Sequence, residues 1–356
     1  MVIGAMNSVG SPELLAKLVN LSNQQGLEEL AAQLQDLSSF LHDDLERIEK
    51  ALRSLELPDA LVGRTAGHLL SHGGKRLRPL CVALASHLGT GFNSASADIA
   101  VAVELVHHAT LLHDDVVDLA DFRRGAPTAR TEYGNAASIF AGDWLLIEAL
   151  RRVRRAALGN ALGELLATIE EMILAESLQL EYRRRVDTPE EVYFRVAEGK
   201  TAALFRWAML AGGQAGQLPG GACEALGLYG LHLGVAFQLT DDLLDLVGDQ
   251  ARTGKTLLTD LRDGMMTFPL IFALEQRPEL RDPLARVLAQ PDHDDAAEEV
   301  FQTVVGAVRE TGAIERSREL AQYRSIQAVR SLESLPDGVS RRALVAVAES
   351  TVRRNR

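Results

Sequence analysis

The chain has 356 residues, 47% of them apolar and 24% charged, and its net charge of −12 argues against nucleic-acid binding, which needs a basic surface. Two cysteines, Cys81 and Cys223, are too few for a disulfide framework, and no apolar run approaches the roughly 20 residues of a membrane-spanning helix. The N-terminus has no basic and then apolar signal segment, so we expect a cytoplasmic protein without a transmembrane segment.

Helical periodicity dominates from the start of the chain. Apolar residues recur at i, i+3 and i+4 over residues 14–52, and no alternating run is long enough to predict a strand. Glycine and proline then separate further segments of helical length, with a surface loop predicted at 290–295. The sequence therefore predicts one all-α domain over residues 41–356, preceded by a helical extension over 1–40.

The first candidate site in chain order is a basic segment, HGGKRLRP, in which two glycines precede Lys75, Arg76 and Arg78. Glycines allow a ligand to approach the backbone, and lysine and arginine donate hydrogen bonds to anions. A single basic residue is more often a plain surface charge. The segment gains meaning only in combination with the elements that follow.

A first acidic cluster, LLHDDVVD, places Asp114, Asp115 and Asp118 on a predicted helix. Residues at i and i+4 share a helix face, so Asp114 and Asp118 are expected to point the same way. His107 lies seven residues before Asp114 and therefore on the same face, where a functional and a packing role remain equally open. We interpret His113 as structural, because it falls on a different face.

Basic residues follow the first cluster at three places. Arg123 and Arg124 lie in DFRRGAPT, Lys200 and Thr201 in EGKTAAL, and Lys255 in RTGKTLLTD. The fragment GKT occurs twice, but neither copy has the full P-loop spacing or a preceding strand, which excludes a nucleotide-binding P-loop. Surface charge is again the simpler explanation for each residue alone. Two arginines beside an acidic cluster favour a role in binding an anion.

A second acidic cluster, QLTDDLLDLVGD, repeats the spacing with Asp241, Asp242 and Asp245. One DDxxD is most simply a solvated acidic helix face. Two copies inside strongly apolar sequence are different, because clustered carboxylates repel one another and are costly to bury. A hard divalent cation removes that cost, and oxygen-only ligands suit Mg²⁺, whereas the spacing does not match a calcium-binding EF-hand.

Together these motifs resemble the trans-isoprenyl diphosphate synthase family, also called polyprenyl synthetases. The likeness runs from about His72 to Pro269 and is strongest in ELVHHATLLHDDVVDLADFRRGAPT and AFQLTDDLLDLVGD. It implies a single large antiparallel helical bundle around a deep central cavity, the isoprenoid synthase type I fold, and usually a homodimer. Residues 41–356 would form this synthase domain.

The resemblance also implies roles for individual residues. It makes the six aspartates of the two clusters and Lys200 catalytic, with about three Mg²⁺ ions held by Asp114, Asp118, Asp241 and Asp245. It implies an isopentenyl diphosphate site made of Lys75, Arg78, His107 and Arg124. It implies an allylic diphosphate site made of Arg123, Lys200, Thr201, Gln238 and Lys255.

Three positions depart from the family pattern in the segment GKTLLTDLRDGMMTFPL. Thr256 and Leu258 replace the usual proline and glycine, and Met265 replaces a frequent lysine. The segment should therefore be less pre-formed and should lack one diphosphate contact. We expect weaker allylic binding rather than loss of activity, since every carboxylate is present.

Product length is predicted from the helix face that leads back from Asp114. Short-chain relatives carry an aromatic residue at one or both positions that match Ala109 and Thr110, whereas both are small here, and Val106 follows one turn earlier. We therefore predict a medium- to long-chain all-trans polyprenyl diphosphate, with geranylgeranyl diphosphate as the alternative. The competing explanation is that small residues merely allow close helix packing.

Two other classes of protein compete with a synthase. A class I terpene cyclase shares the ionisation step, but it normally carries a different second metal motif and no isopentenyl diphosphate site. A non-catalytic regulatory subunit of a prenyl synthase usually lacks one carboxylate cluster. The complete second DDxxD and the HGGKRLRP segment favour the synthase over both.

Overall fold

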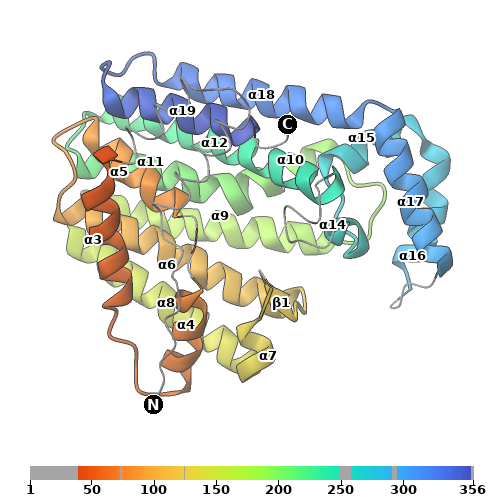
Figure 1. Cartoon of the computed structure of the whole chain (residues 1–356), viewed down its shortest axis with the longest axis horizontal. Coiled ribbons are helices and arrows are strands. Elements are labelled where there is room, and N and C mark those ends of the chain that lie inside the picture. Colours follow the sequence, from red (N-terminus) through yellow and green to blue (C-terminus); the bar gives the residue numbers. More distant parts are fainter. Residues whose placement is uncertain are drawn as a thin grey trace. The chain divides into compact units, whose positions relative to one another are not determined.

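A computed structural model describes residues 39–353, with the exception of 73, 75, 124, 248–257 and 291–294. The predicted extension over residues 1–40 therefore lies almost entirely outside the described part of the chain. The described residues form helices joined by short connections, with one small hairpin (Figure 1). The all-α prediction is confirmed.

The chain divides into two compact units, each assembled from separate stretches of sequence. Unit 1 comprises the residues up to Leu165 together with Trp207–Gly227 and Leu332–Ala346. Its elements are α3 (His42–Arg53), α4 (Leu61–Ser71), α5 (Leu77–His87), α6 (Ser94–Val117), β1 (Phe122–Arg123), β2 (Ala126–Pro127), α7 (Ala129–Tyr133) and α8 (Asn135–Ala156).

Unit 2 comprises Leu166–Arg206, Leu228–Ser331 and the residues from Val347 onwards. Four helices contribute residues to both units, namely α9 (Ala161–Tyr182), α11 (Ala203–Ala215), α12 (Gly220–Val247) and α19 (Val339–Arg353). The remaining elements of unit 2 are α10 (Glu190–Val196), η1 (Ala197–Ala202), α14 (Thr259–Arg262), α15 (Phe268–Gln276), η2 (Pro278–Leu280), α16 (Arg281–Leu288), α17 (Asp295–Glu310) and α18 (Ala313–Ser331).

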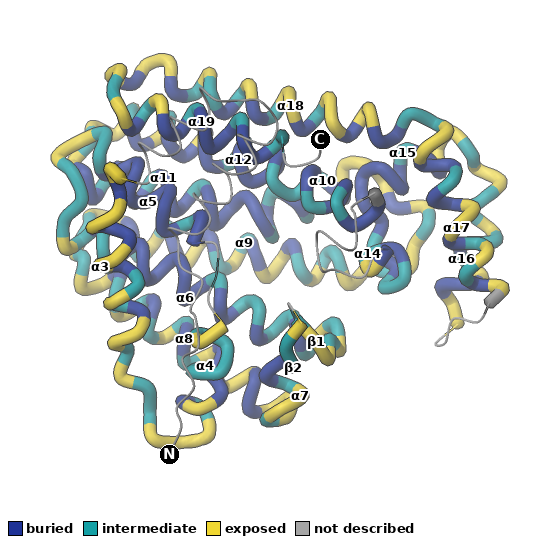
Figure 2. Tube along the Cα trace, viewed as in Figure 1, coloured by how far each residue is buried: buried dark blue, intermediate teal, exposed yellow. Residues whose placement is uncertain are grey.

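The helix that carries the first acidic cluster begins with a capping box. Asn93 accepts a hydrogen bond from the backbone N–H of Ser96, and the Ser96 hydroxyl accepts one from the backbone N–H of Asn93. From this start α6 packs along α5 and α8, and its middle, residues 99–106, is buried throughout (Figure 2). The fixed start and the buried middle set the position of the polar residues at its C-terminal end.

The core of unit 2 gathers apolar side chains from α12, α15, α17 and the segment before η1. Tyr193, Phe268 and Phe301 are among its buried aromatic members, and Leu239 and Leu243 of α12 pack into the same cluster. The two leucines lie on either side of Asp241 and Asp242 in the sequence. The second acidic cluster is therefore held against this core by its own helix.

Two sequence-based expectations about local structure have different outcomes. The helix predicted around residues 41–52 is confirmed as α3, with Leu45, Ile48 and Leu52 buried. The sequence predicted no strand, but β1 and β2 form a two-residue antiparallel ladder around Gly125, which has a φ of 78°. Such a short ladder leaves no alternating pattern in the sequence, and the positive φ favours glycine.

One described helix, α6, is long and apolar enough by length and composition to cross a membrane. However, 67% of its most apolar window is buried inside the protein, as in the core helix of a folded domain. Its hydrophobicity is thus explained by packing against α5 and α8.

Candidate functional site

The first acidic cluster lies at the C-terminal end of α6, where the helix meets the hairpin. Asp114 and Asp118 are half-buried, whereas Asp115 is 1% exposed. Asp118 is the C-cap residue, and its backbone N–H donates to the carbonyl oxygen of Asp114 at 2.8 Å. Asp114 and Asp118 thus keep the helical spacing predicted for them, while Asp115 points into the protein.

Asp115 is paired with an arginine from the hairpin. Nε and Nη2 of Arg123 both lie 2.9 Å from Oδ1 of Asp115. Burial raises the pKa of Asp115, and the nearby guanidinium opposes that effect. The structure therefore uses the middle carboxylate of this cluster to fix Arg123, a residue expected at the allylic diphosphate site. Arg124 lies outside the described residues.

The second acidic cluster lies near the C-terminal end of α12 and shows the same division of roles. Asp241 is half-buried, whereas Asp242 is 2% exposed. The Tyr193 hydroxyl donates to Oδ2 of Asp242 at 2.7 Å, and Nε2 of Gln238 donates to Oδ1, also at 2.7 Å. Burial raises the pKa of Asp242 to about 7. Again the middle carboxylate is buried and held by hydrogen bonds.

The hydrogen bonds continue from Asp242 to a residue of η1. The Thr201 hydroxyl donates to Oε1 of Gln238 at 2.7 Å, so Thr201, Gln238, Asp242 and Tyr193 form one chain of hydrogen bonds. The sequence singled out the first three residues and missed Tyr193. The available signal was the tyrosine between Val192 and Phe194, because a buried tyrosine needs a partner for its hydroxyl.

Asp245 completes the second cluster and also positions the segment that follows it. Its carboxylate oxygens accept hydrogen bonds from the backbone N–H groups of Thr259 and Asp260, both at 3.2 Å. Its carbonyl oxygen accepts one from the backbone N–H of Leu258 at 3.0 Å. Asp245 therefore holds the start of α14, and the connecting residues 248–257, with Lys255 and Thr256, lie outside the described part of the chain.

Leu258 has the left-handed conformation, with a φ of 63°. This is the position where the family pattern usually has glycine, which adopts that conformation without strain. In this chain the leucine side chain is buried in the core of unit 2. Its burial and the hydrogen bond that its backbone N–H donates to the carbonyl oxygen of Asp245 offset the backbone strain. Met265, the third departure, is half-buried.

Lys200 lies in η1, a π-helical turn between α10 and α11. Its Nζ is 2.6 Å from Oε1 of Glu176 and 2.8 Å from Oε1 of Gln179, both on α9. π-Helical turns occur often at functional sites because they turn a side chain out of the regular helical register. The sequence predicted a role for Lys200 but gave no indication of the two α9 partners.

The structure describes two of the four residues expected to bind isopentenyl diphosphate. Arg78 is in the first turn of α5, and His107 is half-buried on α6. Lys75 lies outside the described residues. Arg76, which lies between Lys75 and Arg78 in the sequence, is buried and forms ion pairs with Glu49 and Glu104. The sequence analysis singled out neither glutamate. A glutamate inside the apolar run of α6 needs a buried partner, and that was the signal available.

The three positions predicted to control product length differ in burial. Ala109 and Val106 are 0% and 1% exposed, whereas Thr110 is half-buried. Thr110 lies on the face of α6 that carries His107 and Asp114, by its spacing of three and four residues from them. Among the three, Thr110 is therefore the position with open surface on the face of the acidic cluster.

The donor groups available for a metal are carboxylate oxygens, which fit Mg²⁺. Asp114 and Asp118 keep partial exposure one helical turn apart, and Asp115 fixes a neighbouring guanidinium rather than competing for the ion. Among the described residues, a trio of possible ligands within 4.8 Å of one another is found elsewhere, at His42, Asp43 and Glu46 on the exposed side of α3. Exposed acidic groups of that kind are common without an ion.

Comparison with known proteins gives a consistent result along most of the chain. The family model for polyprenyl synthetase matches residues 59–304. Heptaprenyl diphosphate synthase component 2 of Geobacillus stearothermophilus is 36% identical over 85% of this chain and 93% of that protein. Octaprenyl diphosphate synthase of Escherichia coli is 34% identical over 91% and 99%.

A solved structure extends the likeness to the fold. Polyprenyl synthase from Caulobacter crescentus, complexed with calcium and isoprenyl diphosphate, matches with a TM-score of 0.81 and 30% identity, over 99% of this chain and 100% of that one. The isoprenoid synthase fold predicted from the motifs is confirmed.

Proposed function

We propose that this chain, which belongs to the polyprenyl synthetase family, joins isopentenyl diphosphate head to tail with an allylic diphosphate in a Mg²⁺-dependent reaction. The observation that carries the proposal is the parallel construction of the two acidic clusters. Each has a buried middle aspartate held by hydrogen bonds and a half-buried first aspartate. Such a construction presents carboxylates in a fixed direction, as a metal site requires.

The proposed metal ligands are Asp114 of α6, Asp118 at the C-cap of α6, and Asp241 and Asp245 of α12. Mg²⁺ bound there would neutralise the charge that develops on the departing diphosphate. The similar protein from Caulobacter crescentus was solved with a divalent cation and an isoprenyl diphosphate, which supports the pairing of these two ligands. About three ions per site is the number that we propose.

The protein's own side chains would bind and orient the two substrates. Arg123, Lys200, Thr201, Gln238 and Lys255 are the proposed allylic site, where cationic donors favour the leaving diphosphate. Lys75, Arg78, His107 and Arg124 are the proposed isopentenyl diphosphate site. Loss of diphosphate leaves an allylic cation, which the double bond of isopentenyl diphosphate attacks, and the departing diphosphate takes the proton released in the elimination. Holding both substrates supplies much of the rate.

The product is a medium- to long-chain all-trans polyprenyl diphosphate. The heptaprenyl and octaprenyl synthases among the similar proteins support this length over geranylgeranyl diphosphate. The small side chain of Thr110 supports it as well, because it does not block a growing chain on the face of α6 that carries Asp114, whereas Ala109 is buried in the packing.

Thr110→Phe is expected to shorten the product by several isoprene units while turnover stays within about threefold. The half-buried threonine lies on the face of the acidic cluster, so an aromatic ring there obstructs the path of the chain. Chromatography of the dephosphorylated products measures the length. Thr110→Ser is the matched control and should leave the length unchanged.

The fully buried neighbour gives a contrasting case. Ala109→Phe, which the sequence also predicts to shorten the product, must displace packed side chains and should cost about 1–3 kcal/mol of stability. If Thr110→Phe makes the wild-type product, the chain does not run along this face of α6.

We propose a homodimer as the working assembly. Phe140 and Ile147 on α8 of unit 1 are 63% and 50% exposed, and such apolar residues on one helix commonly mark an interface. Phe140→Asp is expected to reduce the mass in light scattering from twice that of one chain to that of one chain. Tyr323→Asp, a comparable change of an exposed aromatic residue on α18, is the control.

The name of the similar Geobacillus protein, component 2, raises the alternative of a second, different subunit for this chain. Pure protein incubated with isopentenyl diphosphate, a labelled allylic diphosphate and Mg²⁺ separates the possibilities. Condensation by the pure chain supports the proposal. Products only after addition of another protein would indicate a heteromer, and a cyclised hydrocarbon would indicate a terpene cyclase.

A further inference from the structure

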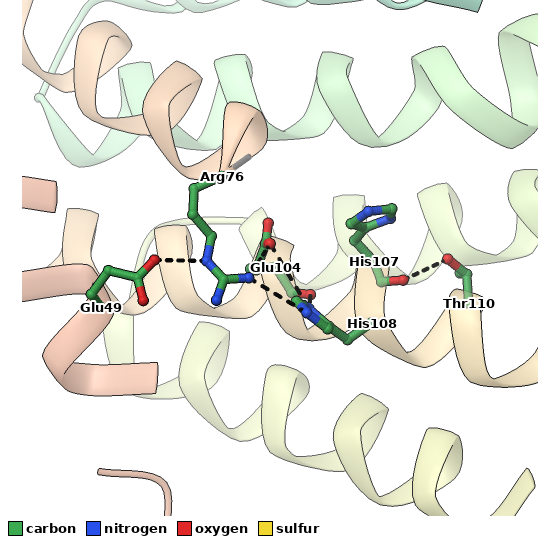
Figure 3. A network of polar contacts seen from close by, with 6 residues as sticks. All are labelled: Glu49, Arg76, Glu104, His107, His108 and Thr110. Atoms are coloured by element: carbon green, nitrogen blue, oxygen red, sulfur yellow. Dashed lines mark hydrogen bonds and ion pairs between the residues drawn. The ribbon is translucent and has the colours of Figure 1, made fainter. Parts of the chain in front are cut away.

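The segment HGGKRLRP contains one arginine that faces into the protein. Arg76 is 3% exposed and lies between Lys75 and Arg78, the residues proposed to bind isopentenyl diphosphate. Figure 3 shows its guanidinium reaching from the start of α5 towards Glu49 of α3 and Glu104 of α6. An arginine in this position pairs with the protein's own carboxylates and does not face a ligand.

The Arg76 guanidinium donates hydrogen bonds to two carboxylates from two different nitrogen atoms. Nε donates to Oε1 of Glu49 at 2.8 Å, and Nη1 donates to Oε1 of Glu104 at 2.7 Å. Nη1 also lies 3.5 Å from Nε2 of His108. Nδ1 of His108 is 2.7 Å from the carbonyl oxygen of Glu104, so Nδ1 carries the proton and Nε2 faces the guanidinium as an acceptor.

Glu104 is the centre of charge in this network. It is buried, and the attraction of Arg76 holds the pKa of its carboxyl below the usual value in spite of burial, with a smaller contribution from Arg78. One carboxylate of α6 therefore attracts both arginines of the basic segment. His107, the next residue to His108, turns its ring to a different side of α6 (Figure 3).

The backbone of the segment is shaped around the same ion pair. Arg76 has a φ of 50° and a ψ of 32°, a left-handed conformation that is unfavourable for a residue with a Cβ atom. A Cβ atom at Gly74 would lie 3.0 Å from Nη1 of Arg76 and 3.3 Å from Oε1 of Glu104. The absence of a side chain at Gly74 thus lets the backbone pass directly over the ion pair. The left-handed conformation of Arg76 then directs the backbone into the start of α5.

We propose that Arg76, held by Glu49 and Glu104, is a positioning residue that sets the affinity of the proposed synthase for isopentenyl diphosphate without touching that substrate. The inference rests on the proposed function. Because Arg76 fixes the turn that leads into α5, its loss lets Arg78 and the preceding loop move away from the binding geometry. A further consequence is that α3 contributes to substrate affinity through Glu49.

The test is Arg76→Lys, which keeps the charge but loses the planar fork that donates from Nε to Glu49 and from Nη1 to Glu104. The KM for isopentenyl diphosphate should rise at least about tenfold, while kcat and the KM for the allylic substrate stay within about twofold. Calorimetric titration with isopentenyl diphosphate should show the same loss of affinity. Arg64→Lys, the same substitution at an exposed position of α4, is the control and should change nothing.

Glu49→Gln gives a second, milder variant, because Glu49 is at the edge of the network and more exposed than Glu104. It should raise the same KM by a smaller factor, and it carries the test if Arg76→Lys does not fold. In a double-mutant cycle, Arg76→Lys should have less effect when Arg78 is already alanine, since the proposed action passes through Arg78.

Equal changes in both KM values, a change in kcat alone, or no change in Arg76→Lys and Glu49→Gln would overturn the inference. Additivity with Arg78→Ala would do the same. The proposed function fails separately, if the wild-type chain binds isopentenyl diphosphate in the calorimeter but condenses nothing. In that case the titrations of the variants still decide the role of Arg76.

Discussion

Asp114→Ala is expected to lower kcat/KM for condensation at least about a thousandfold, which corresponds to about 4 kcal/mol of lost transition-state stabilisation. The substitution removes a carboxylate that is half-buried at the end of α6 and that shares a helix face with Asp118. The effect should fall on catalysis more than on folding, since the buried pairing at this helix end belongs to Asp115 and Arg123. Steady-state assays at saturating Mg²⁺ measure the loss, and raising Mg²⁺ should not restore the rate.

The matched control for Asp114→Ala is Glu46→Ala. Glu46 belongs to the exposed trio on α3 whose atoms lie close enough together to hold an ion. Its removal should leave both the rate and the Mg²⁺ dependence as in the wild type. If Asp114→Ala keeps the rate within about tenfold of wild type, the loss is too small for a metal ligand, and the proposed role of the cluster is wrong.

Gly234→Val is expected to destabilise the protein by about 3 kcal/mol or more, because it forces apart two helices in contact. A Cβ atom at Gly234 of α12 would lie 2.4 Å from Cα of Ala202 in η1, closer than real Cβ atoms come to non-bonded atoms. The backbones must therefore separate. Denaturant unfolding measures the free-energy change.

Separation of α12 from η1 should also disturb the proposed allylic site. Thr201 is adjacent to Ala202, and its hydrogen bond to Gln238 spans η1 and α12 at 2.7 Å. We therefore expect the variant that remains folded at low temperature to have a raised KM for the allylic substrate.

Gly306→Val is the control, since a Cβ atom at Gly306 of α17 meets nothing within 4 Å. It should change stability by less than about 0.5 kcal/mol, because valine is a slightly better helix former than glycine. Equal destabilisation by both substitutions would show that the close approach of α12 to η1 does not matter.

The sequence by itself determined the fold class and the position of the two acidic clusters. Periodic apolar residues such as Leu45, Ile48 and Leu52 predicted a helix that the structure contains. The i, i+4 spacing of Asp114 and Asp118 placed both on one face because helix geometry is local. These inferences needed no knowledge of what the residues contact.

Tertiary structure alone decided which polar residue pairs with which. Asp114 and Asp115 are chemically identical in the sequence, yet one is half-buried and the other is 1% exposed against Arg123. Arg76 and Arg78 are likewise equivalent in HGGKRLRP, but Arg76 is fixed between carboxylates of α3 and α6 that lie 27 and 28 residues away. A buried charge is stable only beside its partner, and that partner is brought close by the packing of distant helices, which the local pattern of the sequence does not encode.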